Sequence, residues 1–599
     1  MTNCELADLL ALDRTAIPPA GNEQYNSLIH CDSPYLLQHA TNPVRWRPWD
    51  PALLIESHEL NRPLFISIGY ATCHWCHVMA HESFENEEVA DILNNAYIPI
   101  KVDREEHPEL DAYCMAALTA QTGQGGWPLN CFMDSSGRPF YAVTYLPPQQ
   151  RGSIPGLIEL LMNIRQVWDK NRRAVDENAV SIAQAITPAV VTPLHRSDEQ
   201  YAALIRQARE KADQGLLRIY DQQHGGFGSA PKFPMPPYLY YCLTHPEQQF
   251  VEMGISTLRT IFTSGSYDQL AGGLHRYATD PAWRIPHFEK MLYDQALGIY
   301  CACVGYERTQ DPAMLQLATG IADFCKELMI TPAGGWYSAI DADSEGEEGT
   351  YYLWSHEQIV ALFGDTLGPE VARFFQIPPE GLPHLQGKAT LHPRGATKPY
   401  PDWYPGVIAR LRSERNHREL PLIDTKLLTG WNALMLAGLA RLAALVPDGW
   451  YREGALRTRQ AIDQLLTSEP QGLLHSSGRF PHPQAATLED RAFMAFGLAE
   501  LSRIEPRDTD QAHLRELLAQ CDRDSNPDTR RARALPYPYG AIEPHDGVIL
   551  SAQSAYAMAR LRSGQHWPDH ATITTVQCER LVERPLNQLW FLATLPHTP

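Results

Sequence analysis

The sequence lacks an uninterrupted apolar run long enough to cross a bilayer, and it does not begin with a basic segment followed by an apolar one. The first absence excludes spanning helices and the second a secretory leader, so we expect a protein of the cytoplasm with no membrane partner. Basic residues are in the minority, since 50 Lys and Arg stand against 70 Asp and Glu, a net charge of −20. Such a charge repels phosphate backbones, so we expect no nucleic-acid partner.

Cysteines in close pairs are scarce, although the chain has 12 cysteines in all. Most are scattered singly through apolar segments, where cysteine in a reducing compartment usually packs as a small core residue. Cys301 and Cys303 lie two apart in a predicted helix and point to different faces, so we expect no bond between them. A disulfide-rich framework is therefore excluded, and Cys73 and Cys76 remain as the pair that needs a chemical explanation.

The stretch Cys73–His77 has the sequence Cys-His-Trp-Cys-His and stands between two predicted elements. The β-like run Pro63–Gly69 precedes it, and a helical segment follows. A cysteine in the first turn of a helix is favoured as its thiolate by the partial positive charge there, and Cys76 returns to the same helix face one turn later. This context is typical of a thioredoxin active site, so we expect a reversible Cys73–Cys76 disulfide.

The element order of residues 1–190 predicts an α/β thioredoxin-like domain. Strands are expected at 98–103, 130–133 and 138–143, and a closing helix over 155–185. In that fold a cis proline begins the strand that faces the cysteine pair, and Pro128 is the candidate. An ordinary trans proline at the start of an edge strand is the alternative. A proline-bearing stretch then predicts a linker, and we place the boundary near residue 190.

From residue 195 to residue 599 the pattern changes to amphipathic helices separated by glycine turns. A Gly-Gly pair followed by an aromatic or aliphatic residue recurs, as at 225–227, 272–274 and 334–336. Regular units of helix, turn and helix are what a closed ring of helical hairpins needs. We therefore predict an all-α (α/α)6 toroid of the six-hairpin glycosidase type. A helical solenoid, which also stacks hairpins, is the alternative.

Polar residues that suit a sugar-like small-molecule substrate gather beside these turns. The candidates for the catalytic set of the second domain are His275, His287, Glu289, Asp294, Asp341 and Asp343. Glycoside hydrolysis needs two carboxylates across the scissile bond, and isomerisation needs groups that move a proton, such as the pair His275 and His287. Surface ion pairs and a solvated acidic loop are the alternative explanation for these charges.

The acidic residues from Asp341 to Glu347 alternate along the chain as oxygen ligands of a metal do. The twelve-residue calcium pattern is not matched, however, so we expect no metal in this loop and no cofactor elsewhere.

Longer motifs resemble one known family over nearly the whole chain. They are Ser33–Ala40, Cys73–Phe84, Lys101–Glu106, Thr122–Leu129, His287–Asp294, Asp341–Gly349 and Lys426–Asn432. Together they are similar to the spermatogenesis-associated protein 20-like family, also described as thioredoxin domain-containing. The resemblance implies a thioredoxin-like domain fused to a glycosidase-like barrel, similar to those of N-acylglucosamine 2-epimerases and several glycosidases. A link to carbohydrate metabolism follows from the fold alone.

Three hypotheses for the function follow. In the first, Cys73 attacks a disulfide of a protein or other thiol partner, Cys76 resolves the mixed disulfide, and Pro128 shapes the substrate groove. In the second, the barrel is a sugar hydrolase or isomerase, and the thioredoxin-like domain is its scaffold or sensor.

The third hypothesis places a structural zinc ion on Cys73, Cys76, His77 and His81, since thiolate and imidazole are common zinc ligands. Positions i, i+3, i+4 and i+8 lie along one side of a single helix, however, and do not surround one ion. We therefore expect His74 and His77 to tune the thiolate instead.

Overall fold

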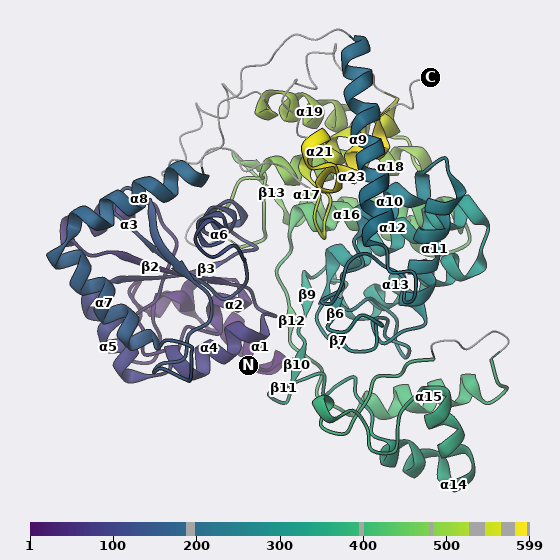
Figure 1. Cartoon of the computed structure of the whole chain (residues 1–599), viewed down its shortest axis with the longest axis horizontal. Helices are drawn as coiled ribbons and strands as arrows, with labels where there is room; N and C mark the ends of the chain where they lie inside the picture. Colours follow the sequence, from purple (N-terminus) through teal and green to yellow (C-terminus); the bar gives the residue numbers. More distant parts are fainter. Residues whose placement is uncertain (187–197, 394–399, 479–482, 526–545, 565–580, 596–599) are drawn as a thin grey trace.

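The computed structural model describes residues 1–186, 198–393, 400–478, 483–525, 546–564 and 581–595. Two bodies lie side by side, a sheet-containing domain at the N-terminal end and a larger helical one (Figure 1). The expected boundary near residue 190 lies outside the described residues. Among the described helices, none combines the length and the apolar character that crossing a membrane requires.

The first domain is built on a five-stranded sheet with the order β1-β3-β2-β4-β5. Its strands are β1 (Arg47–Pro48), β2 (Leu64–Gly69), β3 (Ile98–Asp103), β4 (Leu129–Met133) and β5 (Pro139–Val143). β1, β3 and β2 run parallel, whereas β4 is antiparallel to β2 and β5. β2, β3 and β4 are buried along their whole length, as expected for strands covered on both faces.

Helices cover both faces of this sheet, and each face has its own apolar core. One core joins Phe65 and Phe132 to α2 (Pro34–Leu37), α5 (Glu87–Ala96) and α7 (Leu157–Lys170). The other joins alternate strand residues to α3 (Ala52–Leu60) and α6 (Pro108–Thr122). The sheet order and the two layers are those of a thioredoxin-like fold, which confirms the prediction.

The prediction of one closing helix over 155–185 is wrong. The segment forms two helices, α7 and α8 (Arg172–Ile186), because Asn171 between them has the non-helical dihedrals φ −143° and ψ 54°. α8 then packs against β5 and α6 instead of extending α7.

The helical domain closes into a ring. Among the described residues, the inner helices contact one another in the order α10, α12, α16, α18, α21, α23 and back to α10. Their bounds are Pro236–Thr244, Leu292–Thr309, Thr429–Leu445, Leu488–Ile504, Ala552–Ser563 and Leu589–Thr594. α16 is apolar around its whole circumference and almost entirely buried, as a helix in the inner layer must be.

Amphipathic helices pack outside this ring. They are α9 (Asp198–Ile219), α11 (Gln248–Phe262), α13 (Pro312–Leu328), α17 (Tyr451–Leu465) and α19 (Asp508–Ser525). α11, α13, α17 and α19 each pack against the inner helix that they follow, whereas α9 packs against α23 and the turn before it. Because α23 returns to α10, the predicted toroid is confirmed and the solenoid alternative is wrong (Figure 1).

The recurrent glycine turns are small hairpins that connect an outer helix to the next inner one. Residues on either side pair as antiparallel bridges, Tyr220 with Phe227 and Tyr267 with Leu274. Gly226 illustrates the need for glycine, since its φ is +85° and an added Cβ would lie 2.6 Å from the Trp283 ring.

One excursion interrupts the ring between β11 (Glu347–Glu348) and β12 (Ile423–Asp424). It contains α14 (His356–Phe374) and α15 (Tyr404–Arg415), which enclose an apolar core of their own around Trp354 and Phe375. In Figure 1 it lies at the lower right, away from the thioredoxin-like domain.

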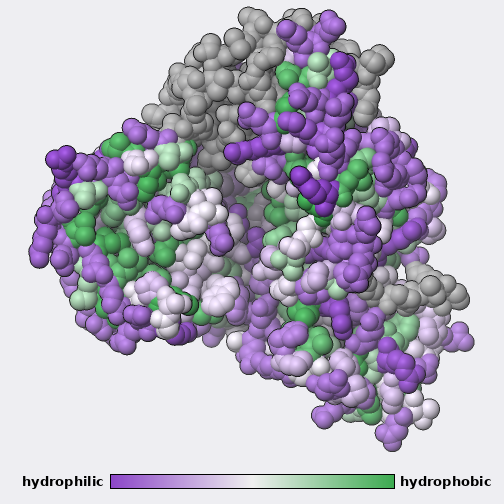
Figure 2. Space-filling view, in the orientation of Figure 1, coloured by the Kyte–Doolittle hydropathy of each residue, from purple (hydrophilic) through white to green (hydrophobic). Residues whose placement is uncertain are grey.

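A cavity of about 620 Å³ lies on the outer side of the thioredoxin-like domain, between β5, α7 and α8. Exposed apolar side chains, among them Tyr141 and Val167, lie beside it, and Figure 2 shows hydrophobic surface on this domain. None of the predicted site residues lines the cavity.

Candidate functional site

Cys73 and Cys76 form a disulfide at the start of α4 (His74–Met79), with their Cα atoms 5.2 Å apart. Cys73 caps the helix, because its Sγ accepts a hydrogen bond from the Cys76 N–H at 3.3 Å. α4 continues as a π-helical turn over Ala80–Phe84. Cys73 is 4% exposed and Cys76 1%, so the pair is covered although it stands at the end of the sheet.

Pro128 lies beside the end of β2, because Leu129 after it pairs with Ile68. The Trp127–Pro128 peptide bond is cis, as predicted. The Trp127 indole N–H donates to Asp111 at 2.7 Å, and the Arg104 guanidinium lies 4.0 Å from the centre of a Trp127 ring. The proline loop is thus held from within its own domain.

A first group of charged barrel residues meets the segment that precedes Cys73; it stands next to the short strands β6 (Tyr277–Ala278) and β8 (Lys290–Met291). The Thr72 hydroxyl, next to Cys73, donates to Glu289 Oε1 at 2.6 Å. Arg276 donates to Glu289 Oε2 at 2.7 Å and to the Tyr70 hydroxyl at 2.5 Å. Glu289 therefore holds the segment that leads into the disulfide against the barrel.

Glu289 is completely buried, and two cations keep it ionised. Burial works to raise its pKa, but Arg276 and His287 together hold it at about 2. His287 Nε2 lies 3.3 Å from Glu289, and its Nδ1 lies 2.6 Å from Glu348. Burial disfavours the imidazolium, yet these two carboxylates raise the pKa of His287 to about 10.

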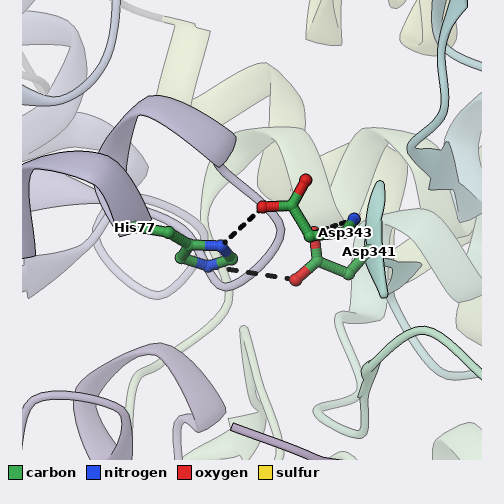
Figure 3. A group of neighbouring side chains, drawn as sticks. All are labelled: His77, Asp341 and Asp343. Carbon is green, nitrogen blue, oxygen red and sulfur yellow. Dashed lines mark hydrogen bonds and ion pairs between the residues drawn. The ribbon is translucent and has the colours of Figure 1, made fainter. Parts of the chain in front are cut away.

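A second group of charges meets α4 itself (Figure 3). His77 Nδ1 lies 3.4 Å from Asp343 Oδ2, and its Nε2 lies 3.9 Å from Asp341 Oδ2. His74 Nδ1 lies 3.0 Å from Asp343 Oδ2. Asp341 lies between β9 (Ala339–Ile340) and β10 (Asp343–Ser344) of the barrel, and Asp343 begins β10.

The pKa values of the two carboxylates in this second group shift in opposite directions. Burial raises the pKa of Asp341 to about 7. Asp343 is also desolvated, but its hydrogen bonds to His74 and His77 hold its pKa below the usual value. Burial acts to lower the pKa of His77, and Asp341 and Asp343 outweigh it and raise that pKa to about 9.

A third contact between the domains is a buried cluster around one ammonium group. Lys426 Nζ lies 3.0 Å from Asp103, 2.9 Å from Glu105 and in contact with Asp424. Asp103 ends β3 and Glu105 follows it, whereas Asp424 and Lys426 belong to the barrel. All four side chains are at most 2% exposed. We call Lys426, Asp103, Glu105 and Asp424 the Lys426 cluster.

His475 adds a fourth contact. Its Nε2 lies 2.7 Å from the Glu105 carbonyl oxygen, and its Nδ1 lies 2.7 Å from Asp490 of the barrel. Burial disfavours its charge, but Asp490 raises the pKa of His475 to about 9. A charged His475 donates from both nitrogens and so bridges the two domains.

The structure brings only part of the predicted set together. Glu289 and His287 lie beside Thr72, and Asp341 and Asp343 lie beside α4. His275 does not join them: its ring packs on Tyr352, its Nδ1 bonds the Phe288 carbonyl, and burial lowers its pKa to about 3.

Asp294 occupies the first turn of α12 and is 3% exposed. Within the described residues its Oδ2 has no hydrogen-bond partner, and burial holds its pKa well above the usual value.

The ligand set proposed for structural zinc is wrong. Cys73 and Cys76 bond to each other, and His77 faces barrel carboxylates. The His81 side chain is 73% exposed and pairs with Glu85.

Sequence reasoning missed the residues that join the domains, namely Tyr70, Thr72, Arg276, Lys426 and His475. Lys426 begins one of the motifs noted above, but the sequence did not indicate that its partners lie in the other domain.

Comparison with known proteins places this arrangement in a family. A family model described as Thioredox_DsbH, a protein of unknown function (DUF255), matches residues 25–187. Human spermatogenesis-associated protein 20 is 32% identical over 527 residues, which cover 80% of this chain and 67% of the human protein. The chain belongs to the spermatogenesis-associated protein 20 family. Rat spermatogenesis-associated protein 20 is 34% identical over 465 residues, 59% of its length.

Solved structures with similar helical parts include a family 76 α-mannanase from Bacteroides thetaiotaomicron and a sugar epimerase from a ruminal bacterium. The first is 11% identical with a TM-score of 0.34, and the match covers 66% of this chain and 81% of the mannanase. The second is 13% identical with a TM-score of 0.26, and the match covers 53% and 86%.

We predict that Lys426→Met destabilises the protein. Removing the ammonium leaves three buried carboxylates without a cation, so the free energy of unfolding should fall by about 3–5 kcal/mol. Thermal unfolding of the full chain measures this. Lys326→Met, on the exposed face of α13, is the matched control, and an unfolding temperature equal to that of wild type in Lys426→Met would refute the prediction.

We predict that the contribution of His475 to stability depends on pH. Its pKa rises from 6.5 to about 9 on folding, so the contribution is complete below about pH 6.5 and is lost as pH rises through 9. Wild type should therefore exceed His475→Gln by up to about 3 kcal/mol at pH 6, and the difference should shrink by pH 10. Chemical unfolding at both pH values measures it, with the exposed His384→Gln as control. A difference independent of pH would contradict the assignment.

Proposed function

We propose that this protein is a thiol–disulfide oxidoreductase whose cysteine pair acts on a small substrate beneath the barrel. The observation that carries the proposal is the Cys73–Cys76 disulfide, which stands at a helix start in a thioredoxin-like fold and whose neighbours Thr72 and His74 bond to the second domain. The cis Pro128 loop beside the pair would form one wall of the substrate site.

The reaction begins from the reduced protein. The Cys73 thiolate attacks one sulfur of the substrate disulfide, and the other sulfur leaves as a thiolate that takes up a proton. Cys76 then attacks Cys73 Sγ, which releases the second substrate thiol and forms the Cys73–Cys76 bond. The substrate gains two electrons, and a thiol reductant such as glutathione returns two electrons to the cysteine pair.

Access to the pair argues for a small substrate. Thr72 and His74, on either side of Cys73, both bond to barrel carboxylates, so the surface on which a protein substrate would rest is already occupied. The Trp75 side chain, which is 54% exposed, marks the side on which α4 meets solvent. In this proposal a small disulfide enters on that side, without separation of the domains.

The test compares a small disulfide with a protein disulfide. Reduced wild type should reduce bis(2-hydroxyethyl) disulfide but act slowly on insulin, and Cys73→Ser should reduce neither. Lys426→Met should gain activity toward insulin because it loosens the cover, whereas Lys326→Met should not. A protein that forms no Cys73–Cys76 disulfide at any glutathione ratio would refute the proposal.

A sugar hydrolase or isomerase is the second candidate, and Asp294 favours it. A buried carboxyl that stays protonated is what a general acid needs, and Asp294 has a raised pKa and an oxygen without a partner. Glu289 suits this role less well, because both of its oxygens are bonded to Thr72 or Arg276.

Turnover of a panel of sugars tests this candidate. If the barrel is active, Asp294→Asn should lower kcat by at least about 100-fold, since general acid catalysis contributes roughly 10²–10⁴-fold. Glu289→Gln should act mainly on stability. Equal rates in wild type and Asp294→Asn would remove Asp294 from the catalytic set, and no turnover of any sugar would count against the candidate as a whole.

A further inference from the structure

We propose that His77, Asp341 and Asp343 form a binding site for one divalent cation of the zinc type, shared between the two domains (Figure 3). This set differs from the four-residue zinc set of the sequence analysis. It takes one imidazole from α4 and two carboxylates from a barrel loop 264 residues further along the chain, and it uses no cysteine.

The separations of the ligand atoms suit a single ion. One ligand atom from each of the three residues lies within 4.8 Å of the other two. Zinc binds imidazole nitrogen and carboxylate oxygen at about 2.0–2.2 Å, so two ligands at a tetrahedral angle lie about 3.4 Å apart. His77 Nδ1 and Asp343 Oδ2 have that separation, 3.4 Å. Asp341 Oδ2 lies 3.9 Å from His77 Nε2, on the other side of the ring, so Asp341 must move toward Nδ1 when the ion binds.

The orientation of His77 is the second observation. Its Nε2 lies 2.8 Å from the Ala71 carbonyl oxygen, to which it donates a hydrogen bond. In a neutral ring the lone pair of Nδ1 then points toward a carboxylate oxygen, and two acceptors are stable at that distance only with a proton or a metal cation between them. A backbone carbonyl that fixes the tautomer is the usual partner of a metal-binding histidine.

The carboxylates are also held from outside the proposed site. His74 Nδ1 lies 3.1 Å from Asp343 Oδ1 and 3.0 Å from Oδ2, and the Asp343 N–H donates to Asp341 Oδ1 at 3.3 Å. Asp341 is 3% exposed. Such outer contacts orient ligating carboxylates in metal sites. The loop is therefore shaped before an ion arrives.

The donor types select the class of ion. Ca²⁺ and Mg²⁺ prefer six or more oxygen ligands, whereas imidazole combined with carboxylate suits Zn²⁺ and its first-row neighbours. Three protein ligands leave one position of a tetrahedral ion for water or a substrate atom. The ion would also join α4 to the barrel beside the cysteine pair.

Equilibrium dialysis of the full chain against Zn²⁺, after removal of metal by a chelator, tests the proposal. The protein is kept oxidised, so that the Cys73 and Cys76 sulfurs are not available as thiolates. We expect one equivalent of zinc in wild type and a loss of affinity of more than about 100-fold in Asp341→Asn and in Asp343→Asn, because losing a ligand exceeds the 10–100-fold effect of losing an outer contact.

His81→Ala, on the same helix region but exposed and paired with Glu85, is the control and should bind zinc as wild type does. Zinc should also raise the unfolding temperature of wild type and of His81→Ala but not of the aspartate variants. The unfolding transition of each protein shows that it is folded, and the difference between the variants shows where the ion binds. Zinc that binds only to the reduced chain, or binds equally to Asp343→Asn and wild type, would overturn the proposal. So would no binding at all.

Discussion

One buried ammonium group, that of Lys426, determines how the two domains fit together. Asp103 and Glu105 of the first domain and Asp424 of the second would repel one another in a desolvated interface, and Lys426 is the cation that faces all three. With the end of β3 fixed in this way, the neighbouring end of β2 is also placed, and with it the segment from Tyr70 to His77. The contacts of Glu289, Asp341 and Asp343 follow from that placement.

The contact between the two domains changes what the polar residues at the mouth of the barrel bind. In an open toroid, Glu289, His287, Asp341 and Asp343 would face solvent and a diffusing ligand. Here Glu289 accepts a hydrogen bond from Thr72, which precedes Cys73, and Asp343 faces His74 and His77 of the cysteine-bearing segment. The cysteine pair therefore belongs to one domain, whereas most of the charged groups that face its segment belong to the other.

Much of the fold could be predicted from local patterns. The strand expected at 98–103 is β3, and those expected at 130–133 and 138–143 differ from β4 and β5 by one residue at one end. In these strands apolar and polar residues alternate, or the residues are apolar throughout, and clear turn residues stand on either side. Such a pattern can be recognised from neighbouring residues alone. The break at Asn171 was not predictable, because α7 and α8 share a continuous helical pattern. The site was harder to predict, because Asp341, a partner of His77, lies 264 positions later in the sequence. No rule of residue spacing predicts a contact between two domains.

The attachment of the first domain to a surface formed much later in the sequence has a consequence for synthesis. Domains fold in order as the chain emerges, so the thioredoxin-like fold is complete when residue 186 has appeared. The barrel residues that bond to it extend from Arg276 to His475. During that interval Cys73 and Cys76 stand uncovered on a folded domain. The nascent chain thus has a period in which the segment from Tyr70 to His77 lacks the barrel contacts of the finished protein, and completion of the barrel ends that period.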